Sequence, residues 1–108
     1  MTADQTRGIR ELNDLARQTF TGCRVMITPG IQRLEDIDAV LRKVQLFDTF
    51  TAENDPYGEH DFGSFRHNGE TVFWKFDYYD LDLTMHSPDA SDPYVTARVL
   101  NVMLGEEY

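Results

Sequence analysis

The sequence predicts an α+β fold, with three helices packed on a small antiparallel sheet centred on a β-hairpin, in the order α-β-α-β-β-(β)-α. Apolar residues recur at helical spacing in the first half of the chain, and an Asn68-Gly69 turn signal separates two alternating runs. Hydrophobic residues (41%) and charged residues (27%) have ordinary globular proportions. Because 108 residues can bury one core and are too few for two, we expect a single domain over residues 1–108.

The first expected helix begins at a cap formed by Thr2 or Thr6 and ends before Gly22, which suits the position just past a helix. Its apolar residues recur at helical spacing: Ile9, Leu12, Leu15, Ala16 and Phe20. In residues 23–28, apolar Cys23, Val25 and Ile27 occupy every second position. This alternation, ahead of the turn signal at residues 29–30, predicts a short strand.

A second helix is predicted for residues 34–47, where one apolar stripe is formed by Ile37, Val40, Leu41 and Val44. Acidic residues in its first turn and basic residues near its end complement the helix dipole. A polar loop over residues 48–58 follows, because turn-forming residues are concentrated there.

The strongest structural signal is the Asn68-Gly69 pair, since both residues tolerate the positive φ of a type I′ hairpin turn. A two-residue loop would pair residues 67, 65 and 63 with residues 70, 72 and 74, in that order. The core-facing residues are then Phe65, Val72, Trp74, Phe76 and Tyr78. The opposite face mixes polar and aromatic groups and is solvated, covered by a helix, or a binding surface.

The C-terminal part is expected to contain one more strand and a last helix. Leu81, Leu83 and Met85 alternate with polar residues after a bend, which favours the strand. Asp92 would cap the helix and Pro93 would take its first position. Its buried side would come from Val95, Val99, Leu100, Val102, Met103 and Leu104.

The whole net charge of −9 arises in the second half of the chain. Residues 1–51 hold seven acidic and seven basic residues, whereas residues 52–108 hold twelve acidic residues against only Arg66, Lys75 and Arg98. Such a field repels phosphate groups, so we expect no direct binding of nucleic acid or of an anionic membrane. The expected partner is a basic protein surface.

The chain shows no targeting or membrane signal. No stretch approaches the roughly 18 apolar residues of a membrane span, and residues 1–10 are polar where a signal peptide would be apolar. A single Cys23 can form neither an internal disulfide nor a multi-cysteine zinc site. We therefore expect a cytoplasmic protein without a cofactor.

Two clusters hold the side chains that could carry chemistry. One includes Asp55, Tyr57, Glu59, His60 and Asp61, and the other includes Asp77, Tyr79, Asp80 and Asp82. In the expected register His60 lies across from Asp77, so that imidazole and carboxylates would converge for metal binding or acid/base work. We favour the alternative that these residues cap turns and line a wet strand face, because the spacings H-E-x-x-H and the EF-hand loop are absent.

Other kinds of site have less support. Cys23 falls on the apolar side of its expected strand, and no G-x-S-x-G elbow or phosphate-binding loop is present. His67 and His86 are expected at the surface. Aromatic residues could form a recognition surface, although we expect most of them in the core: Tyr57, Phe62, Phe73, Tyr78 and Tyr79.

The chain resembles a known bacterial family, domain of unknown function 3768, in residues 54–63 (NDPYGEHDFG), residues 73–80 (FWKFDYYD), Asp92-Pro93 and residues 98–100. The resemblance extends to residues 9–13 and 103–108, and its central motif is long enough to be specific. It implies small proteins encoded on plasmids and other mobile elements, and it carries over no catalytic residue.

We therefore expect a non-enzymatic binding protein that mimics the charge of DNA and docks on a basic, nucleic-acid-binding surface of a host defence protein such as a restriction or CRISPR complex. The partner-binding residues would be Asp55, Tyr57, Glu59, His60, Asp61, Asp77, Tyr79, Asp80 and Asp82. One alternative is a small metal-dependent or acid/base enzyme that uses Glu59, His60, Asp61, Asp77 and Asp80. Another is a self-associating structural protein.

Overall fold

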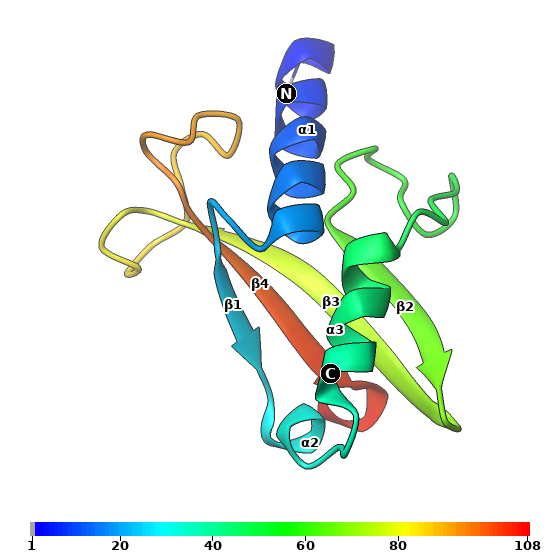
Figure 1. Ribbon diagram of the computed structural model, residues 1–108. Helices are drawn as coiled ribbons and strands as arrows, with labels where there is room; N and C mark the ends of the chain where they lie inside the picture. Colours follow the sequence, from blue (N-terminus) through cyan, green and yellow to red (C-terminus); the bar gives the residue numbers. More distant parts are fainter. Residues whose placement is uncertain (1) are drawn as a thin grey trace.

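A computed structural model describes residues 2–108 and shows an α+β fold in which helices cover one face of a four-stranded sheet (Figure 1). The strand order is β1-β4-β3-β2. The elements are α1 (Ala3–Thr19), β1 (Arg24–Ile27), α2 (Pro29–Gln32), α3 (Ile37–Leu46), β2 (Phe62–His67), β3 (Glu70–Tyr79), β4 (Ala97–Leu104) and the 3₁₀ helix η1 (Gly105–Glu107). The α+β prediction is confirmed. The sheet is mixed, however, because β1 runs parallel to β4.

The first helix is capped as its sequence predicts. The Thr2 hydroxyl accepts a hydrogen bond from the Gln5 backbone N–H (3.1 Å), and the Gln5 side chain accepts one from the Thr2 N–H (2.9 Å). The helix ends at Phe20, which takes a left-handed conformation (φ 56°) and donates its N–H to the Ala16 carbonyl. Phe20 therefore provides the C-terminal turn that the sequence had suggested for Gly22.

The next elements are confirmed in place, with one addition. β1 occupies four of the residues expected to form a strand, and α3 is shorter at both ends than the helix expected over residues 34–47. The additional element is α2, a single turn with Pro29 at its start. Glu107 holds this turn, since its carboxylate accepts from the Thr28 hydroxyl (2.6 Å) and from the Gly30 N–H (3.0 Å). The C-terminus is thereby tied to the start of α2.

The hairpin has the expected register. His67 pairs with Glu70, and the pairing continues without interruption to Phe62 and Lys75. Asn68 and Gly69 form the turn with positive φ angles of 49° and 82°. Trp74, on the face that the sequence assigns to the core, is 0% exposed. The hairpin prediction is confirmed.

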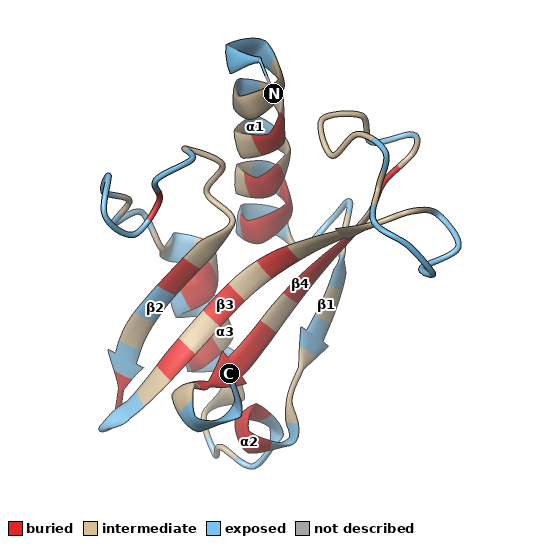
Figure 2. Cartoon of the chain, turned by 180° about the vertical axis from the view of Figure 1, so that it is seen from behind, coloured by how far each residue is buried: buried red, intermediate tan, exposed pale blue. Residues whose placement is uncertain are grey.

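The core lies between the sheet and the helices. Figure 2 shows that buried residues are concentrated on β3 and β4, the two central strands. α1 contributes Ala16, and α3 contributes Val40 and Val44. The sheet contributes Val72, Trp74, Phe76, Leu100, Val102 and Leu104. The 3₁₀ helix η1 lies against Phe73 on the opposite face, where Phe62 and Phe73 also pack against Tyr108, with ring centroids 5.0–5.8 Å apart.

The helix expected at the C-terminal end is wrong, because residues 97–104 form β4. β4 lies between β3 and β1 and pairs with both, and side chains on both of its faces are buried. A strand of this kind has no alternation in its sequence, and its apolar run can be mistaken for a helix. The capping signal still operates locally, since the Asp92 side chain accepts from the Tyr94 N–H (2.9 Å).

The strand expected around residues 81–85 is also wrong. Asp80 closes a turn there, because its N–H donates to the Met85 carbonyl (2.8 Å) and its side chain accepts from the Thr84 N–H (3.0 Å). Leu83 adopts a left-handed φ of 60°. The apolar side chains of this segment are left exposed.

His67 is buried, against the expectation of a surface residue, and His86 is exposed as expected. The His67 ring lies between the Lys43 Nζ (2.9 Å from Nδ1) and the Asp36 Oδ2 (2.6 Å from Nε2). The hydrogen bond from His67 lowers the pKa of the Asp36 carboxyl below its ordinary value.

Within residues 2–108, no helix has the length and apolar character needed to cross a membrane.

Gly63 is expected to be the least replaceable residue of β2. A Cβ at this position would lie 2.5 Å from the Trp74 Nε1, so the indole ring occupies the space that a side chain would need. Gly63→Ala should lower the free energy of unfolding by about 1–3 kcal/mol through overpacking. Ser64→Ala, on the exposed face of the same strand, is the matched control. Urea unfolding followed by tryptophan fluorescence measures both, and equal midpoints for the two variants would contradict the close packing of Trp74 on Gly63.

Candidate functional site

Two acidic loops lie on either side of α1, as Figure 1 shows: the loop of residues 48–61 and the loop of residues 80–96. The Arg10 side chain donates to the Gly58 carbonyl of the 48–61 loop (3.1 Å). Gly8 lies against the 80–96 loop, since a Cβ added there would be 3.5 Å from the Ser91 Cβ. α1 therefore positions both loops.

Asn13 joins these parts from the buried side of α1, where it is 0% exposed. Its amide nitrogen donates to the Glu59 carbonyl (3.1 Å) and to the Tyr78 hydroxyl (2.8 Å). Its oxygen accepts from the Nε of Arg98 (2.7 Å). Arg98 is 4% exposed and also donates to the Ala90 carbonyl (2.6 Å). One network thus connects α1 with β3, β4 and both acidic loops.

His60 lies between two carboxylates at the end of the 48–61 loop. Its Nδ1 is 2.8 Å from the Asp14 Oδ1 of α1, and its Nε2 is 3.6 Å from the Asp55 Oδ2. Its ring stacks on Phe50, with centroids 3.7 Å apart. Because both ring nitrogens face carboxylates and the backbone has a left-handed φ of 54°, the imidazole is held in one position.

Arg17 contacts Phe50 and Asp14, two of the residues around His60. Its guanidinium is 5.3 Å from the centroid of the Phe50 ring and 5.2 Å from that of Trp74, and it donates to Asp14 and to the Phe47 carbonyl. A cavity of about 390 Å³ opens beside Arg17 and His60. Asn13 and Arg17 occupy positions on the buried stripe of α1. Polar residues on an apolar stripe are the sequence signal that could have identified this network.

The expected approach of His60 to Asp77 is wrong. Strand pairing ends at Phe62, so His60 belongs to the loop and contacts the helix side of the sheet. Asp77 lies on the open face, where it accepts from the Asn101 amide (2.9 Å) and contacts the Lys75 Nζ (3.3 Å). Tyr79, two residues further along β3, shares the open face with Asp77. His60 and Asp77 therefore lie on opposite faces of the sheet, whereas Asp80 and Asp82 belong to the 80–96 loop.

The carboxylates of the 48–61 loop have different environments. Asp55 is buried (9% exposed) and accepts from the His60 N–H (3.2 Å). Burial raises the pKa values of the Glu59 and Asp61 carboxyl groups, and the repulsion between these two groups raises that of Glu59 further. The Tyr78 hydroxyl donates to the Glu59 Oε1 (3.1 Å). Burial also raises the pKa of Tyr78, which keeps this donor protonated.

The 80–96 loop combines acidic groups with exposed apolar ones. Hydrogen bonds from Thr84 hold the Asp80 carboxylate and lower its pKa, while Asp82 is exposed. Leu81, Met85 and Tyr94 expose 64%, 71% and 86% of their surface. In the other loop Tyr57 is 78% exposed. Of the expected partner-binding residues, Tyr57 and Asp82 are thus fully available at this end of the molecule, and Asp55 is not.

Neither Cys23 nor Ser87 is placed as an activated nucleophile. Cys23 packs against the core, and burial raises the pKa of its thiol. The Ser87 hydroxyl is 2.7 Å from the Thr96 hydroxyl. Within residues 2–108, no group of three or more His, Cys, Asp or Glu side chains is placed to hold a metal ion. The geometry is that of a structured surface with a fixed arrangement of charges.

Glu59→Gln is expected to stabilise the protein at neutral pH. The raised pKa means that the folded state binds the Glu59 proton more tightly than the unfolded chain does. The free energy of unfolding therefore falls as the pH rises through this raised pKa. The amide keeps an acceptor for the Tyr78 hydroxyl and removes the charge. Urea unfolding should show a higher midpoint than wild type at pH 7 and a vanishing difference at about pH 3.5, below the usual pKa of glutamate. The exposed Glu53→Gln is the control, and a lower midpoint for Glu59→Gln at pH 7 would refute the direction of the shift.

We also expect no tight binding of divalent metal ions, because His60 and Asp77 lie on opposite faces of the sheet and the candidate ligands match no standard metal-site spacing. Elemental analysis of protein purified without added ions tests this, together with calorimetric titration of zinc, manganese and magnesium. Stoichiometric metal that disappears in His60→Ala would contradict the prediction.

Comparison with known proteins identifies a family. The family described as "Protein of unknown function", domain of unknown function 3768, matches residues 27–107, from the end of β1 to η1. No curated protein and no solved structure shows detectable similarity to the chain. Since the match spans about three quarters of the sequence, including both acidic loops and β4, the chain belongs to the family of domain of unknown function 3768.

Proposed function

We propose that this protein is a small, non-enzymatic binding protein whose two acidic loops dock on a basic surface of another protein. The observation that carries the proposal is the charge of these loops. Residues 48–61 contain five acidic residues and residues 80–96 contain four, and neither loop has a Lys or Arg. Both loops lie beside α1, so their fields add at one end of the molecule (Figure 1).

The exposed apolar side chains support a protein as the partner. Leu81, Met85 and Tyr94 lie in the same loop as Asp82, and their exposure leaves apolar surface that a partner would cover. Protein interfaces combine a few apolar or aromatic anchors with a charged rim. An acidic surface that served only to keep the protein soluble would not need these exposed apolar side chains.

The partner that we propose is a nucleic-acid-binding protein of a host defence system, whose basic groove the acidic loops would occupy in place of DNA. This step rests on an analogy with small acidic inhibitors of mobile elements and on the charge asymmetry of the chain. A partner of this kind is met in the cytoplasm, the compartment that the single cysteine also favours.

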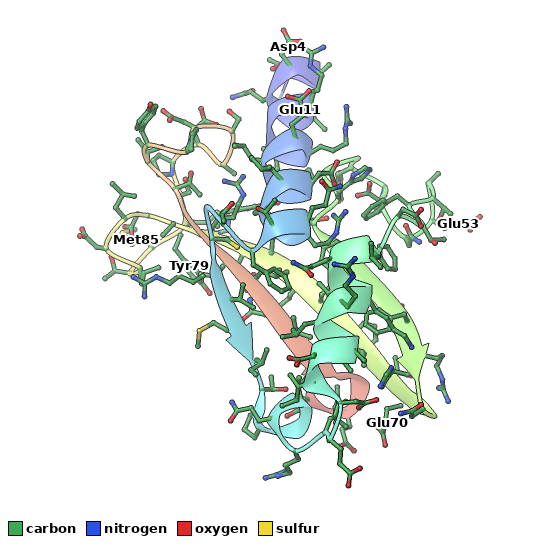
Figure 3. The ribbon with its side chains drawn as sticks, viewed as in Figure 1. Asp4, Glu11, Glu53, Glu70, Tyr79 and Met85 are labelled. Atoms are coloured by element: carbon green, nitrogen blue, oxygen red, sulfur yellow. The ribbon has the colours of Figure 1, made fainter. Side chains whose placement is uncertain are left out.

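Charge reversal in the loops should weaken capture of a basic partner. We choose Glu53→Lys and Asp82→Lys, because both residues are exposed and lie in different acidic loops. The double variant should slow association by about tenfold at low salt, since a steering field of this kind raises association rates by about 10 to 1,000 times. The matched control is Glu70→Lys, an exposed acid at the hairpin turn, far from Glu53 and Met85 (Figure 3).

The experiment is a pull-down from host lysate, followed by binding kinetics at two salt concentrations and competition with duplex DNA. Association should slow as salt rises, because charges separated by more than about 8 Å are screened at physiological ionic strength. Capture of a partner whose binding ignores salt, DNA and both loop reversals would refute the proposal, as would equal effects of Glu70→Lys and the loop variants.

A further inference from the structure

A second and larger cavity, of about 490 Å³, lies between α1 and the 80–96 loop. It is lined by Gln5 and Ile9 of α1, by Glu59, by Tyr78 of β3 and by residues 86–90. Both acidic loops therefore contribute to its wall. This volume is within the range of pockets that hold a small molecule or a long side chain.

The lining of this cavity is acidic and in part apolar. It contains the carboxylates of Glu59 and Asp89 and the imidazole of His86, and no Lys or Arg. Ile9, Pro88 and Ala90 supply apolar surface, and Tyr78 supplies an aromatic ring. A group that is cationic at its end and apolar along its stem would match such a wall.

The two carboxylates keep free acceptors. The Glu59 Oε1 accepts from the Tyr78 hydroxyl, and within residues 2–108 its Oε2 receives no hydrogen bond. The Asp89 Oδ1 accepts twice from Ser91, and the same described residues leave its Oδ2 without a donor. One free carboxylate oxygen thus belongs to each loop. A ligand with several fixed donors could use both.

Within residues 2–108, Glu59 forms no salt bridge, and the charge of Arg98 acts on it only from a distance. The nearby Arg98 guanidinium is engaged by Asn13 and by the Ala90 carbonyl, and it stacks on the Tyr78 ring at 5.1 Å. Burial and the neighbouring Asp61 raise the pKa of the Glu59 carboxyl, and the positive charge of Arg98 offsets this rise only in part. A cation from outside would remove this penalty.

We propose that this cavity receives the guanidinium group of an arginine side chain of the partner protein, with Glu59 and Asp89 as acceptors and Ile9, Tyr78 and Pro88 around the apolar stem. The inference rests on the proposed function, because the arginine is a residue of the basic surface on which the loops dock. Arginine suits the site better than lysine, since its planar group offers five donors to carboxylate oxygens on two sides.

The probe is the peptide acetyl-Gly-Arg-Gly-amide, titrated into ¹⁵N-labelled protein. The backbone amide signals of Gln5, Ile9 and Ala90 should shift together with one dissociation constant. The same peptide with citrulline in place of arginine is the neutral control, because it keeps the shape and loses the charge. Shifts that spread over all exposed acidic residues, or equal binding of the citrulline peptide, would overturn the inference.

Two variants localise the effect. Glu59→Gln keeps the hydrogen bond from Tyr78. It should lower the affinity for the arginine peptide by about tenfold, the effect of losing one charge-assisted hydrogen bond. Glu70→Gln, exposed at the hairpin turn and outside both acidic loops, should leave binding unchanged. If both variants lost the same affinity for the peptide, the overall negative field and not the cavity would attract it, and the proposal would be overturned.

A final titration distinguishes an arginine of a partner protein from a free guanidinium compound. Agmatine carries the same guanidinium group on an apolar stem without a peptide backbone, and it should bind more weakly than the peptide. Tighter binding of agmatine would overturn the assignment to a partner's arginine in favour of a free metabolite. Peptide binding without capture of any basic protein would support the cavity while refuting the proposed function. Capture of a basic partner with no peptide binding would refute the cavity alone.

Discussion

The buried amide of Asn13 is the interaction on which the functional end of this molecule depends. A fully buried amide is costly unless its donors and acceptor are satisfied, and here Glu59, Tyr78 and Arg98 satisfy them together. These three residues come from the 48–61 loop, β3 and β4. The position of α1 over the sheet is therefore coupled to the position of both loops, because Arg98 in turn holds the Ala90 carbonyl of the 80–96 loop.

This coupling explains how two long loops can carry many like charges and still have defined structure. Hydrogen bonds to backbone and to short side chains hold individual carboxylates, as at Asp80, Asp89 and Asp92. Such bonds fix geometry without cancelling charge. The negative field therefore arises from carboxylates that hydrogen bonds hold in defined positions, and the proposed electrostatic docking would use this arrangement.

The alternation of side chains along β3 separates the residues that an enzyme would have needed in one place. Tyr78 points toward the helices, where it meets Asn13 and Glu59, whereas Asp77 points to the open face and meets Asn101. His60 is enclosed by Asp14, Asp55 and Phe50. Residues adjacent in sequence thus lie on different surfaces, and the loop end presents acidic and partly apolar side chains, on which the proposed function rests.

The sequence by itself determined the β-hairpin of this protein. The Asn68-Gly69 turn fixed the hairpin register, and the alternation beside it identified the face that buries Trp74, because both signals depend on neighbouring residues alone. Only the tertiary structure decided the state of residues 97–104. Their apolar run suits a buried helix or a central strand equally, and pairing with β3 on one side and β1 on the other selects the strand. The candidate site was likewise decided by tertiary contacts. The cavity wall joins residues 5, 59, 78 and 89, and no local pattern relates residues so far apart in the chain.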